Sequence, residues 1–313
     1  MARTQAHVAA QNPSTNTLRR IAFIGFGEAA QAFLRGWRGE PGFAARVTAY
    51  DIKTASAVKA VRAAKSADYA SMQVEGAADA PSAIEGSPAI FALVTADQAH
   101  TAALAALPGL AKGAFFFDGD SCAPQTKVRT AEAVEAAGGR YVDVAIMAPV
   151  YPRMHKAPLL LSGPHAEAAA PLLESLGMTA PIYAGPVGSA SAVKMIRSVM
   201  MKGLEALVCE CVLAGRKAGV IDFVLDSLDD TYPGFDWKAR SAYMLERVTT
   251  HGLRRAAEMR EVAITVDGFG LDSGMSRACV DWQQRMGDLK IKASDEDALD
   301  YVRMADMILA ELG

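Results

Sequence analysis

The sequence lacks the marks of several protein classes. It has only 4 cysteines, without CxxC spacing, so neither a zinc site nor a disulfide scaffold is expected. Lys and Arg number 32 against 35 Asp and Glu, so no positive excess predicts binding to nucleic acid or an anionic membrane. Apolar runs such as Ala89–Val94 are far shorter than the roughly 18 residues that cross a bilayer. We expect a cytoplasmic protein with no metal, no nucleic-acid partner and no membrane partner.

Hydrophobic residues make up 51% of the 313 residues, which is enough for a large core and predicts two domains. Residues 1–18 are expected to form a flexible tail. From Arg19 to about Gly185, short apolar runs alternate with helical stretches, a pattern typical of a parallel sheet covered on both faces. The expected strands are Arg20–Gly25, Arg46–Asp51, Ala89–Thr95, Ala114–Asp118, Tyr141–Ile146, Pro158–Ser162 and Pro181–Ala184.

The pattern changes after Gly188. Apolar residues recur at helical spacing through Ala190–Ala218, and no strand-like alternation follows. Further helices are expected over Asp236–Met259, Ala278–Met286 and Glu296–Leu312. The fold class predicted from the sequence is therefore α/β, with a doubly wound sheet followed by an all-helical C-terminal domain.

The first expected strand leads directly into a glycine-rich turn. The turn has the form G-x-G-x-x-A and consists of Gly25, Phe26, Gly27, Glu28, Ala29 and Ala30. In such a turn the first glycine permits a tight bend, the second lets the backbone approach a pyrophosphate, and the following helix offers its free N–H groups. Because the string lies between a strand and a helix, it predicts a dinucleotide site rather than a plain turn.

Residues at two other strand ends bear on the cofactor. Asp51 has the spacing of an acid that binds the adenosine ribose hydroxyls and repels a 2′-phosphate, which favours NAD. Lys53 could instead attract that phosphate, so NADP stays open. Val94 and Thr95 end a strand at the carboxyl edge of the sheet and are expected near the nicotinamide ribose, although Thr95 also suits a helix N-cap.

A second motif opens the helical part and carries a family resemblance. From Gly185 the chain reads G-P-V-G-S-A-S-A-V-K and ends at Lys194. Together with the turn at Gly25, it resembles the β-hydroxyacid dehydrogenase family, which includes the 3-hydroxyisobutyrate and 6-phosphogluconate dehydrogenases. The family motif is G-x-x-G-x-G-x-x-x-K-x-x-x-N, and here Ser198 takes the place of the asparagine.

Other segments extend this resemblance over nearly the whole chain from Arg20. Asp118–Pro124 looks like the family's D-x-S-T-x-x-P substrate segment, and Glu205–Gly219 is similar to its E-A-x-x-L-A-x-K-A-G stretch. His251–Met259 is similar to a divergent branch whose C-terminal domain has no known function. The segment Ala148–Lys156 is bulkier and more basic than the family's glycine-rich loop, so the substrate is not expected among the best-known small acids.

The resemblance implies a Rossmann NAD(P)-binding domain over residues 19–185 and a helical substrate and dimerisation domain over residues 186–313. It also implies hydride transfer between a nicotinamide and an acidic hydroxy or carbonyl substrate, with Lys194 as general acid/base. A lysine acts as a base near neutral pH only if burial or a neighbouring cation such as Arg197 lowers its pKa. A homodimer is expected.

Further site residues are weighed against structural roles. Ser121 could hold a substrate carboxylate or simply cap a helix. His251 stands where the family often has a Lys-Asp pair near the nicotinamide, and Ser198 is a doubtful substitute for an amide. Three arginines are candidate clamps for a small anionic substrate: Arg153, Arg197 and Arg254.

Two alternatives stay open. Ser198 and the altered loop Ala148–Lys156 would also fit a protein that senses a dinucleotide without catalysis. The same fold could serve an imine reductase. Lys194 argues against that reading, because reducing an imine requires an acid placed for the nitrogen.

Overall fold

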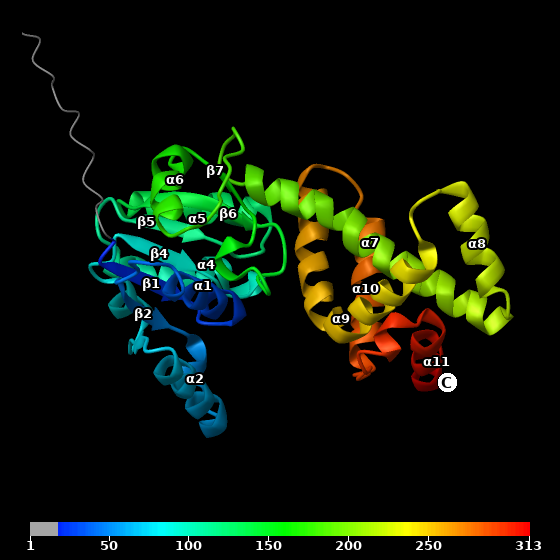
Figure 1. Ribbon diagram of the computed structural model, residues 1–313. Helices are drawn as coiled ribbons and strands as arrows, with labels where there is room; N and C mark the ends of the chain where they lie inside the picture. The colour runs from blue at the N-terminus through cyan, green and yellow to red at the C-terminus, as the bar shows by residue number, and fades with distance from the viewer. Residues whose placement is uncertain (1–17) are drawn as a thin grey trace, which may run out of the picture.

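The N-terminal part is built on one sheet of seven strands in the order β3-β2-β1-β4-β5-β6-β7 (Figure 1). The computed structural model describes residues 18–313, so the expected tail over residues 1–18 lies, except for Leu18, outside the described residues. The strands are β1 (Arg20–Ile24), β2 (Arg46–Tyr50), β3 (Glu75–Gly76), β4 (Ala89–Ala92), β5 (Phe115–Asp118), β6 (Arg140–Ile146) and β7 (Leu159–Ser162). All neighbours pair in parallel except β6 and β7, so the predicted doubly wound fold class is confirmed.

Helices cover both faces of this sheet. They are α1 (Glu28–Arg38), α2 (Lys59–Ser71), α3 (Ala80–Ile84), α4 (Ala99–Ala106), α5 (Pro124–Ala136) and α6 (Ala166–Ser175). Along β1, Phe23 packs in a core with α1 and α6, whereas Ile24 packs in a second core with α3, α4 and α5. Successive strand residues point to opposite faces, and both faces are covered, so the strands are continuously apolar.

Three expectations about the sheet were wrong or incomplete. Pro181–Ala184 is not a strand, and only Ile182 forms an isolated bridge, with Leu161. β7 runs antiparallel to β6 because the two are joined by a loop without an α-helix, and a parallel strand requires a longer crossover. The short elements β3 and α3 were not anticipated.

The C-terminal part is helical. It consists of α7 (Ser189–Ala218), α8 (Ile221–Thr231), α9 (Trp237–Gly268), α10 (Gly274–Asp288) and α11 (Tyr301–Leu312). α7 starts beside the sheet and runs along the whole helical lobe (Figure 1). α9 and α10 cross at two glycines, since a Cβ on Gly252 would lie 2.5 Å from the Gln283 carbonyl oxygen and one on Gly287 would lie 2.5 Å from the Leu253 nitrogen. Among the described residues, no helix is both long and apolar enough to cross a membrane.

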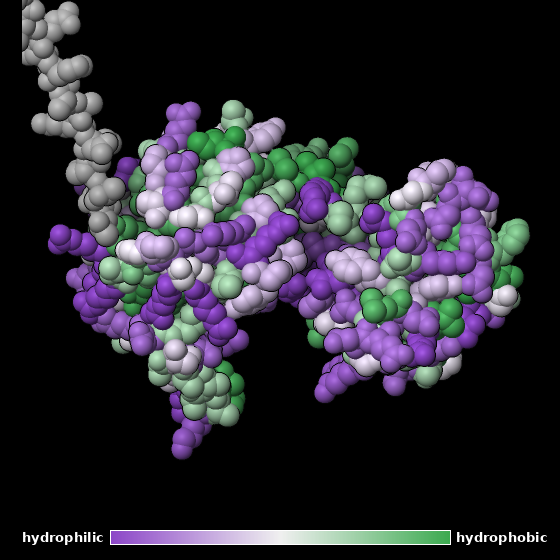
Figure 2. Space-filling model, in the orientation of Figure 1, coloured by the Kyte–Doolittle hydropathy of each residue, from purple (hydrophilic) through white to green (hydrophobic). Residues whose placement is uncertain are grey.

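The two parts form separate lobes joined along α7. Figure 2 shows the surface hollowed between them, with hydrophilic residues on both flanks. The carboxyl ends of the parallel strands lie on the side of the sheet where α7 begins, since Asp143 of β6 binds the first turn of α7. Doubly wound sheets bind their ligands at this edge.

Candidate active site

The glycine-rich turn between β1 and α1 is shaped for close approach of a ligand. Gly25 has a φ of +82°, and a Cβ there would lie 2.5 Å from the Leu93 carbonyl oxygen, so only glycine fits. Gly27 is the N-cap of α1, which no side chain caps, and a Cβ on Gly27 would meet nothing within 4 Å. The open space at Gly27 and the N–H groups of the first turn, which includes Glu28 and Ala29, fit a pyrophosphate.

Asp51 is tied to this turn by hydrogen bonds. Its Oδ2 accepts from the Phe26 backbone N–H at 3.0 Å, and its Oδ1 accepts from the Lys53 N–H at 3.0 Å. The Lys53 side chain is exposed. Lys65, which no sequence motif had singled out, is a buried lysine of α2. Its Nζ lies 3.8 Å from Asp51 Oδ2 and donates to the Phe26 carbonyl at 2.7 Å. The residues at the predicted adenosine end therefore do lie together.

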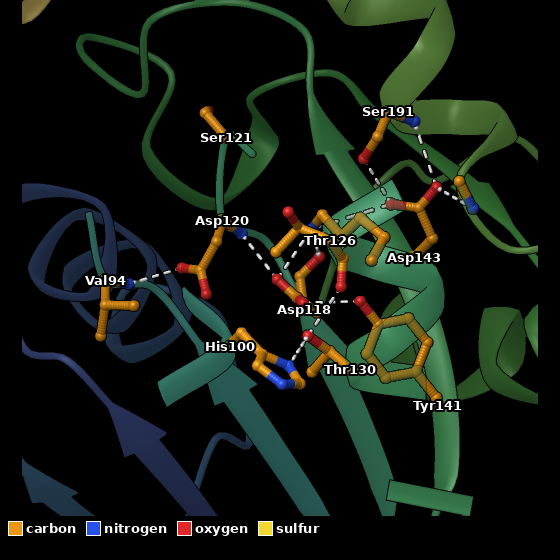
Figure 3. A network of polar contacts seen from close by, with 12 residues as sticks. Val94, His100, Asp118, Asp120, Ser121, Thr126, Thr130, Tyr141, Asp143 and Ser191 are labelled. Atoms are coloured by element: carbon orange, nitrogen blue, oxygen red, sulfur yellow. Dashed lines mark hydrogen bonds and ion pairs between the residues drawn. The ribbon is translucent and has the colours of Figure 1, made fainter. Parts of the chain in front are cut away.

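Val94 and Thr95 lie beyond β4, which ends at Ala92, three residues earlier than expected. The Val94 N–H donates to Asp120 Oδ1 at 2.6 Å (Figure 3). Thr95 is exposed, and its side chain makes no cap. Asp120 is buried, and its Oδ2 has no partner among the described residues. Burial and the nearby Asp118 raise the pKa of Asp120 well above its usual range.

A buried polar network lies below this loop, where the end of β5 pairs with the middle of β6 (Figure 3). The Lys127 ammonium group donates to Asp118 Oδ1 at 2.7 Å and lies 3.8 Å from Asp143 Oδ1. The Tyr141 hydroxyl donates to Asp118 Oδ2 at 2.6 Å. All four side chains are almost completely inaccessible to solvent, so two carboxylates and one ammonium group satisfy one another inside the domain.

The same network fixes the start of α7. Asp143 Oδ2 accepts hydrogen bonds from the Gly188 and Ser191 backbone N–H groups, each at 3.1 Å, and Oδ1 accepts from the Ser191 hydroxyl at 2.6 Å. A carboxylate at a helix N-terminus satisfies free N–H groups and complements the helix dipole. Asp143 therefore sets the position of the first turns of α7, which carry Lys194.

Lys194 and Ser121, two of the residues singled out from the sequence, meet at this point. The Lys194 Nζ donates to Ser121 Oγ at 2.5 Å. Burial lowers the pKa of Lys194 to about 8, and the charges of Lys202 and Lys127 act in the same direction, against the opposing charge of Glu258. About a tenth of this amine is therefore unprotonated at pH 7, far more than for an ordinary lysine.

Ser198 lies one turn further along α7 but does not reach the Lys194 amine. Its hydroxyl donates to the Lys194 backbone carbonyl at 3.0 Å and accepts from Lys202 Nζ at 3.0 Å. The Lys202 ammonium group also pairs with Glu258 Oε2 of α9 at 2.9 Å. Ser198 thus contacts a second lysine of the same helix face.

Other predicted residues are not brought into contact with Lys194. Arg197 is exposed and His251 is half-buried on α9, and within residues 18–313 no hydrogen bond or ion pair joins either to Lys194. Burial lowers the pKa of His251, as do the charges of neighbouring arginines. Arg254 is exposed, 3.8 Å from Glu28 in the phosphate turn.

The basic end of the loop before β7 lies away from this site. His155 and Lys156 both pair with Glu40, just beyond the C-terminal end of α1, at 3.0 and 2.7 Å. That end is opposite to the one that carries the phosphate turn. These two residues therefore anchor the loop on α1, contrary to their expected place in a substrate loop.

Several residues of the site escaped prediction from the sequence: Lys65, Asp120, Lys127, Asp143, Lys202 and Glu258. Two of them had a usable signal: Asp120 lies inside the segment Asp118–Pro124, and Lys202 lies eight residues after Lys194 and so on the same helix face. Glu258 falls inside the string His251–Met259 but follows no spacing rule relative to α7.

Two family models match the chain. Residues 20–185 match the NAD binding domain of 6-phosphogluconate dehydrogenase, and residues 216–286 match a domain of unknown function, DUF1932. The first match covers the whole sheet, including the phosphate turn and Asp51. The second covers α8, α9 and most of α10.

Several solved structures match this chain over most of its length. A conserved hypothetical protein from Sinorhizobium meliloti is 36% identical, with a TM-score of 0.75, over 95% of this chain and 97% of its own. A conserved protein of unknown function, reported to be structurally similar to 3-hydroxyacid dehydrogenases, is 25% identical, with a TM-score of 0.67, over 86% of this chain and 97% of its own. The 3-hydroxyisobutyrate dehydrogenase of Mycobacterium tuberculosis has a TM-score of 0.67 at 15% identity, over 93% of this chain and 99% of its own, which shows a shared fold. The chain therefore belongs to the family with the NAD-binding domain of 6-phosphogluconate dehydrogenase, in a branch that carries the DUF1932 domain.

Proposed function

We propose that this protein is an NAD(P)-dependent oxidoreductase that transfers hydride between a nicotinamide and an acidic hydroxy or carbonyl compound. The contact between Lys194 and Ser121 is the observation that carries the proposal. It places a partly buried amine with a pKa of about 8 at the ligand-binding edge of a dinucleotide-binding sheet.

The Lys194 amine acts as general acid/base. In alcohol oxidation the unprotonated amine takes the hydroxyl proton of the substrate, and in carbonyl reduction the ammonium form returns it. Bound dinucleotide supplies the hydride acceptor or donor. The Ser121 hydroxyl, which already accepts a hydrogen bond from Lys194, orients the amine and binds the substrate oxygen or carboxylate.

The remaining predicted residues have supporting roles in this proposal. Ser198 holds the backbone of α7 and the side chain of Lys202. Arg197 and Arg254 supply positive charge to an anionic substrate, and His251 lines the helical side of the cleft. The proposal keeps the domain division predicted from the sequence, with residues 19–185 for the dinucleotide and residues 186–313 for substrate and dimerisation.

We assign NAD as the preferred cofactor. Gly25, Gly27 and the first turn of α1 would hold the pyrophosphate, and the Asp51 carboxylate would accept hydrogen bonds from the adenosine ribose hydroxyls. A 2′-phosphate would lie close to that carboxylate and be repelled by it. Lys53 is exposed and could offset part of this repulsion, so NADP binding is expected to be weaker rather than absent.

A homodimer formed through the helical domain is part of the proposal. Ile196, Met200 and Leu207 recur at helical spacing on α7 and are more than half exposed. Such an apolar stripe favours association. Sedimentation velocity tests this: a particle of about twice the 33.0 kDa chain mass is expected, and a monomer at micromolar concentration would contradict it.

The experiment that tests the reaction is a turnover screen. Wild type and Lys194→Met are incubated with NAD or NADP and a panel of hydroxy acids, and with the reduced cofactors and the matching keto acids. We expect wild type to turn over at least one acid and Lys194→Met to be slower by about 10³-fold, because general acid–base catalysis contributes about 10²–10⁴-fold. Lys217→Met, at the far end of α7, is the matched control and should retain activity.

The same screen separates the proposal from a dinucleotide sensor. A sensor would bind NADH, seen as a change in nicotinamide fluorescence, and show no turnover with any substrate of the panel. If wild type is active and Lys194→Met turns over at the same rate, the proposed reaction stands but Lys194 is not its acid/base.

A further inference from the structure

Three polar residues occupy one face of α7 next to the site. Lys194, Ser198 and Lys202 are spaced four residues apart, so their side chains lie along the same side of the helix. Ser198 links the other two, since its hydroxyl donates to the Lys194 carbonyl and accepts from Lys202 Nζ. Lys202 is therefore held in a defined position relative to Lys194.

Lys202 is a buried ammonium group with a partner on another helix. Only 10% of its side chain is exposed, and its Nζ lies 2.9 Å from Glu258 Oε2 on α9. Burial alone would raise the pKa of Glu258, but the charge and hydrogen bond of Lys202, with the charges of Lys194 and Arg254, lower it. Glu258 is therefore ionised at neutral pH, and the two residues form a true ion pair.

Both members of the pair act on Lys194. Glu258 stabilises the protonated form of the Lys194 amine, and Lys202 destabilises it. Two further groups have a principal effect on this amine: Lys127 of α5, which acts like Lys202, and the Cys122 thiol, which burial keeps neutral by raising its pKa. Glu261 of α9 also lies near the site, but it accepts a hydrogen bond from the Ala123 N–H. Of the groups with a principal effect, only Glu258 comes from the helical lobe beyond α7.

A purely structural role explains this pair poorly. Buried ion pairs contribute little to stability compared with apolar side chains of similar volume. A second buried pair already joins the same two helices, between Arg255 and Glu205 at 2.9 Å. That pair is not among the principal groups that act on Lys194.

We propose that Lys202 and Glu258 are positioning residues for Lys194: an ion pair between α7 and α9 that sets the electrostatic field at the Lys194 amine. This inference rests on the proposed function, in which Lys194 is the acid/base. Because Glu258 belongs to α9, the field at the amine depends on how α9 packs against α7. The DUF1932 domain thereby tunes a group carried by the interdomain helix.

The test uses the reactivity of the Lys194 amine, which requires neither substrate nor cofactor. The purified full chain is labelled with trace acetic anhydride between pH 6 and 10, and acetylation at Lys194 is quantified by mass spectrometry. Wild type should show a midpoint at a pH of about 8. In Lys202→Met the loss of a cation raises the pKa of the amine, so its labelling rate at pH 7 should fall roughly tenfold.

The double variant Lys202→Met with Glu258→Gln decides between an electrostatic and a structural role. Removing the carboxylate lowers the pKa of Lys194 again, so the labelling rate at pH 7 should recover to within about threefold of wild type. Loosened packing would instead leave the double variant as slow as Lys202→Met or slower, which would overturn the proposal. Glu258→Gln alone is not informative, because it also leaves a buried ammonium group without its partner.

Two further variants serve as controls. Lys202→Arg keeps the charge and should label like wild type. Glu205→Gln removes a carboxylate from the other α7–α9 pair and should leave the rate within about twofold of wild type, and a tenfold change there would count against the proposal. If Lys202→Met does not give a cooperative melt, Lys202→Gln, which keeps the hydrogen-bonding capacity, replaces it with the same expectation.

Labelling and turnover can fail separately. The expected labelling pattern without turnover on any substrate would keep the ion pair and reject the proposed reaction. Turnover that depends on Lys194, with labelling unaffected by Lys202→Met, would keep the proposed reaction and reject the role of the ion pair.

Discussion

The two polar clusters that flank Lys194 differ in how firmly they are held. On the sheet side, Asp118, Lys127 and Asp143 are inaccessible to solvent and satisfy one another directly. On the helical side, Arg254 is half exposed and lies 3.8 to 3.9 Å from Glu28 and Glu258. The first cluster fixes a backbone, while the second pairs the buried Lys202 ammonium group with Glu258, whose charge and that of the neighbouring Arg254 are partly screened by solvent and salt.

The two clusters therefore have different roles around the Lys194 amine. The sheet side determines where Lys194 is, because Asp143 holds the first turn of α7. The helical side determines what charge surrounds Lys194, through Lys202 and Glu258. Variants on the two sides should therefore differ in kind: loss of stability on the sheet side, and changes in affinity or pH dependence on the helical side.

The largest effect is expected from Asp143→Asn, which removes one carboxylate from the buried cluster on the sheet side. The amide cannot carry the charge that complements Lys127 and the helix N-terminus, and its NH₂ group would face donors from Gly188 and Ser191. Loss of a buried charge partner should lower the free energy of unfolding by about 3 kcal/mol. Urea denaturation followed by far-UV circular dichroism measures this.

Ser191→Ala is the matched control for that variant. It removes one donor to Asp143 and leaves the backbone N–H groups in place, so a cost of about 1 kcal/mol is expected. An Asp143→Asn protein with the urea midpoint of wild type would mean that the network does not anchor α7.

A smaller effect, about tenfold per pH unit, is expected in the pH dependence of turnover. Alcohol oxidation requires unprotonated Lys194, so its kcat/KM should rise up to a pH of about 8 and then level off. Carbonyl reduction requires the ammonium form, so its kcat/KM should be level below that pH and fall above it. Profiles recorded in both directions check the sign, and a parallel trend in the two directions would exclude Lys194 as the titrating group.

Local motifs were sufficient to predict the outline of the site. The turn at Gly25–Ala30 is defined by spacing within one segment, and the lysine at position 194 was singled out by its resemblance to the family motif. Ser121 and Lys194 were each singled out from their own motif, but the contact between them was not predicted. The sheet itself followed from continuous apolar strands between helical stretches.

The unpredicted features depend on contacts between segments far apart in the chain. A short apolar strand such as β7 has the same pattern in either direction, so its antiparallel pairing could not be recognised. Lys202 and Glu258 lie on different helices, and only packing of α7 against α9 brings them together. His251 was weighed as a site residue because of its family position, yet Glu258, two turns later on α9, is the residue whose charge reaches Lys194.

The smallest effect is expected from Arg254→Gln, which removes an exposed positive charge from the helical-side cluster. Arg254 lies 3.8 Å from Glu28 at the phosphate turn, where its charge offsets an acid beside the expected pyrophosphate. Since exposed pairs contribute at most about 1 kcal/mol, the Kd for NADH should rise no more than about fivefold at low salt, and the difference should disappear near 0.5 M salt. Fluorescence titration measures both values, and Arg260→Gln, whose guanidinium donates to Gln284 on α10, should bind NADH like wild type. A loss of NADH affinity well above tenfold, or one insensitive to salt, would mean that Arg254 acts as a buried, unscreened charge like those on the sheet side.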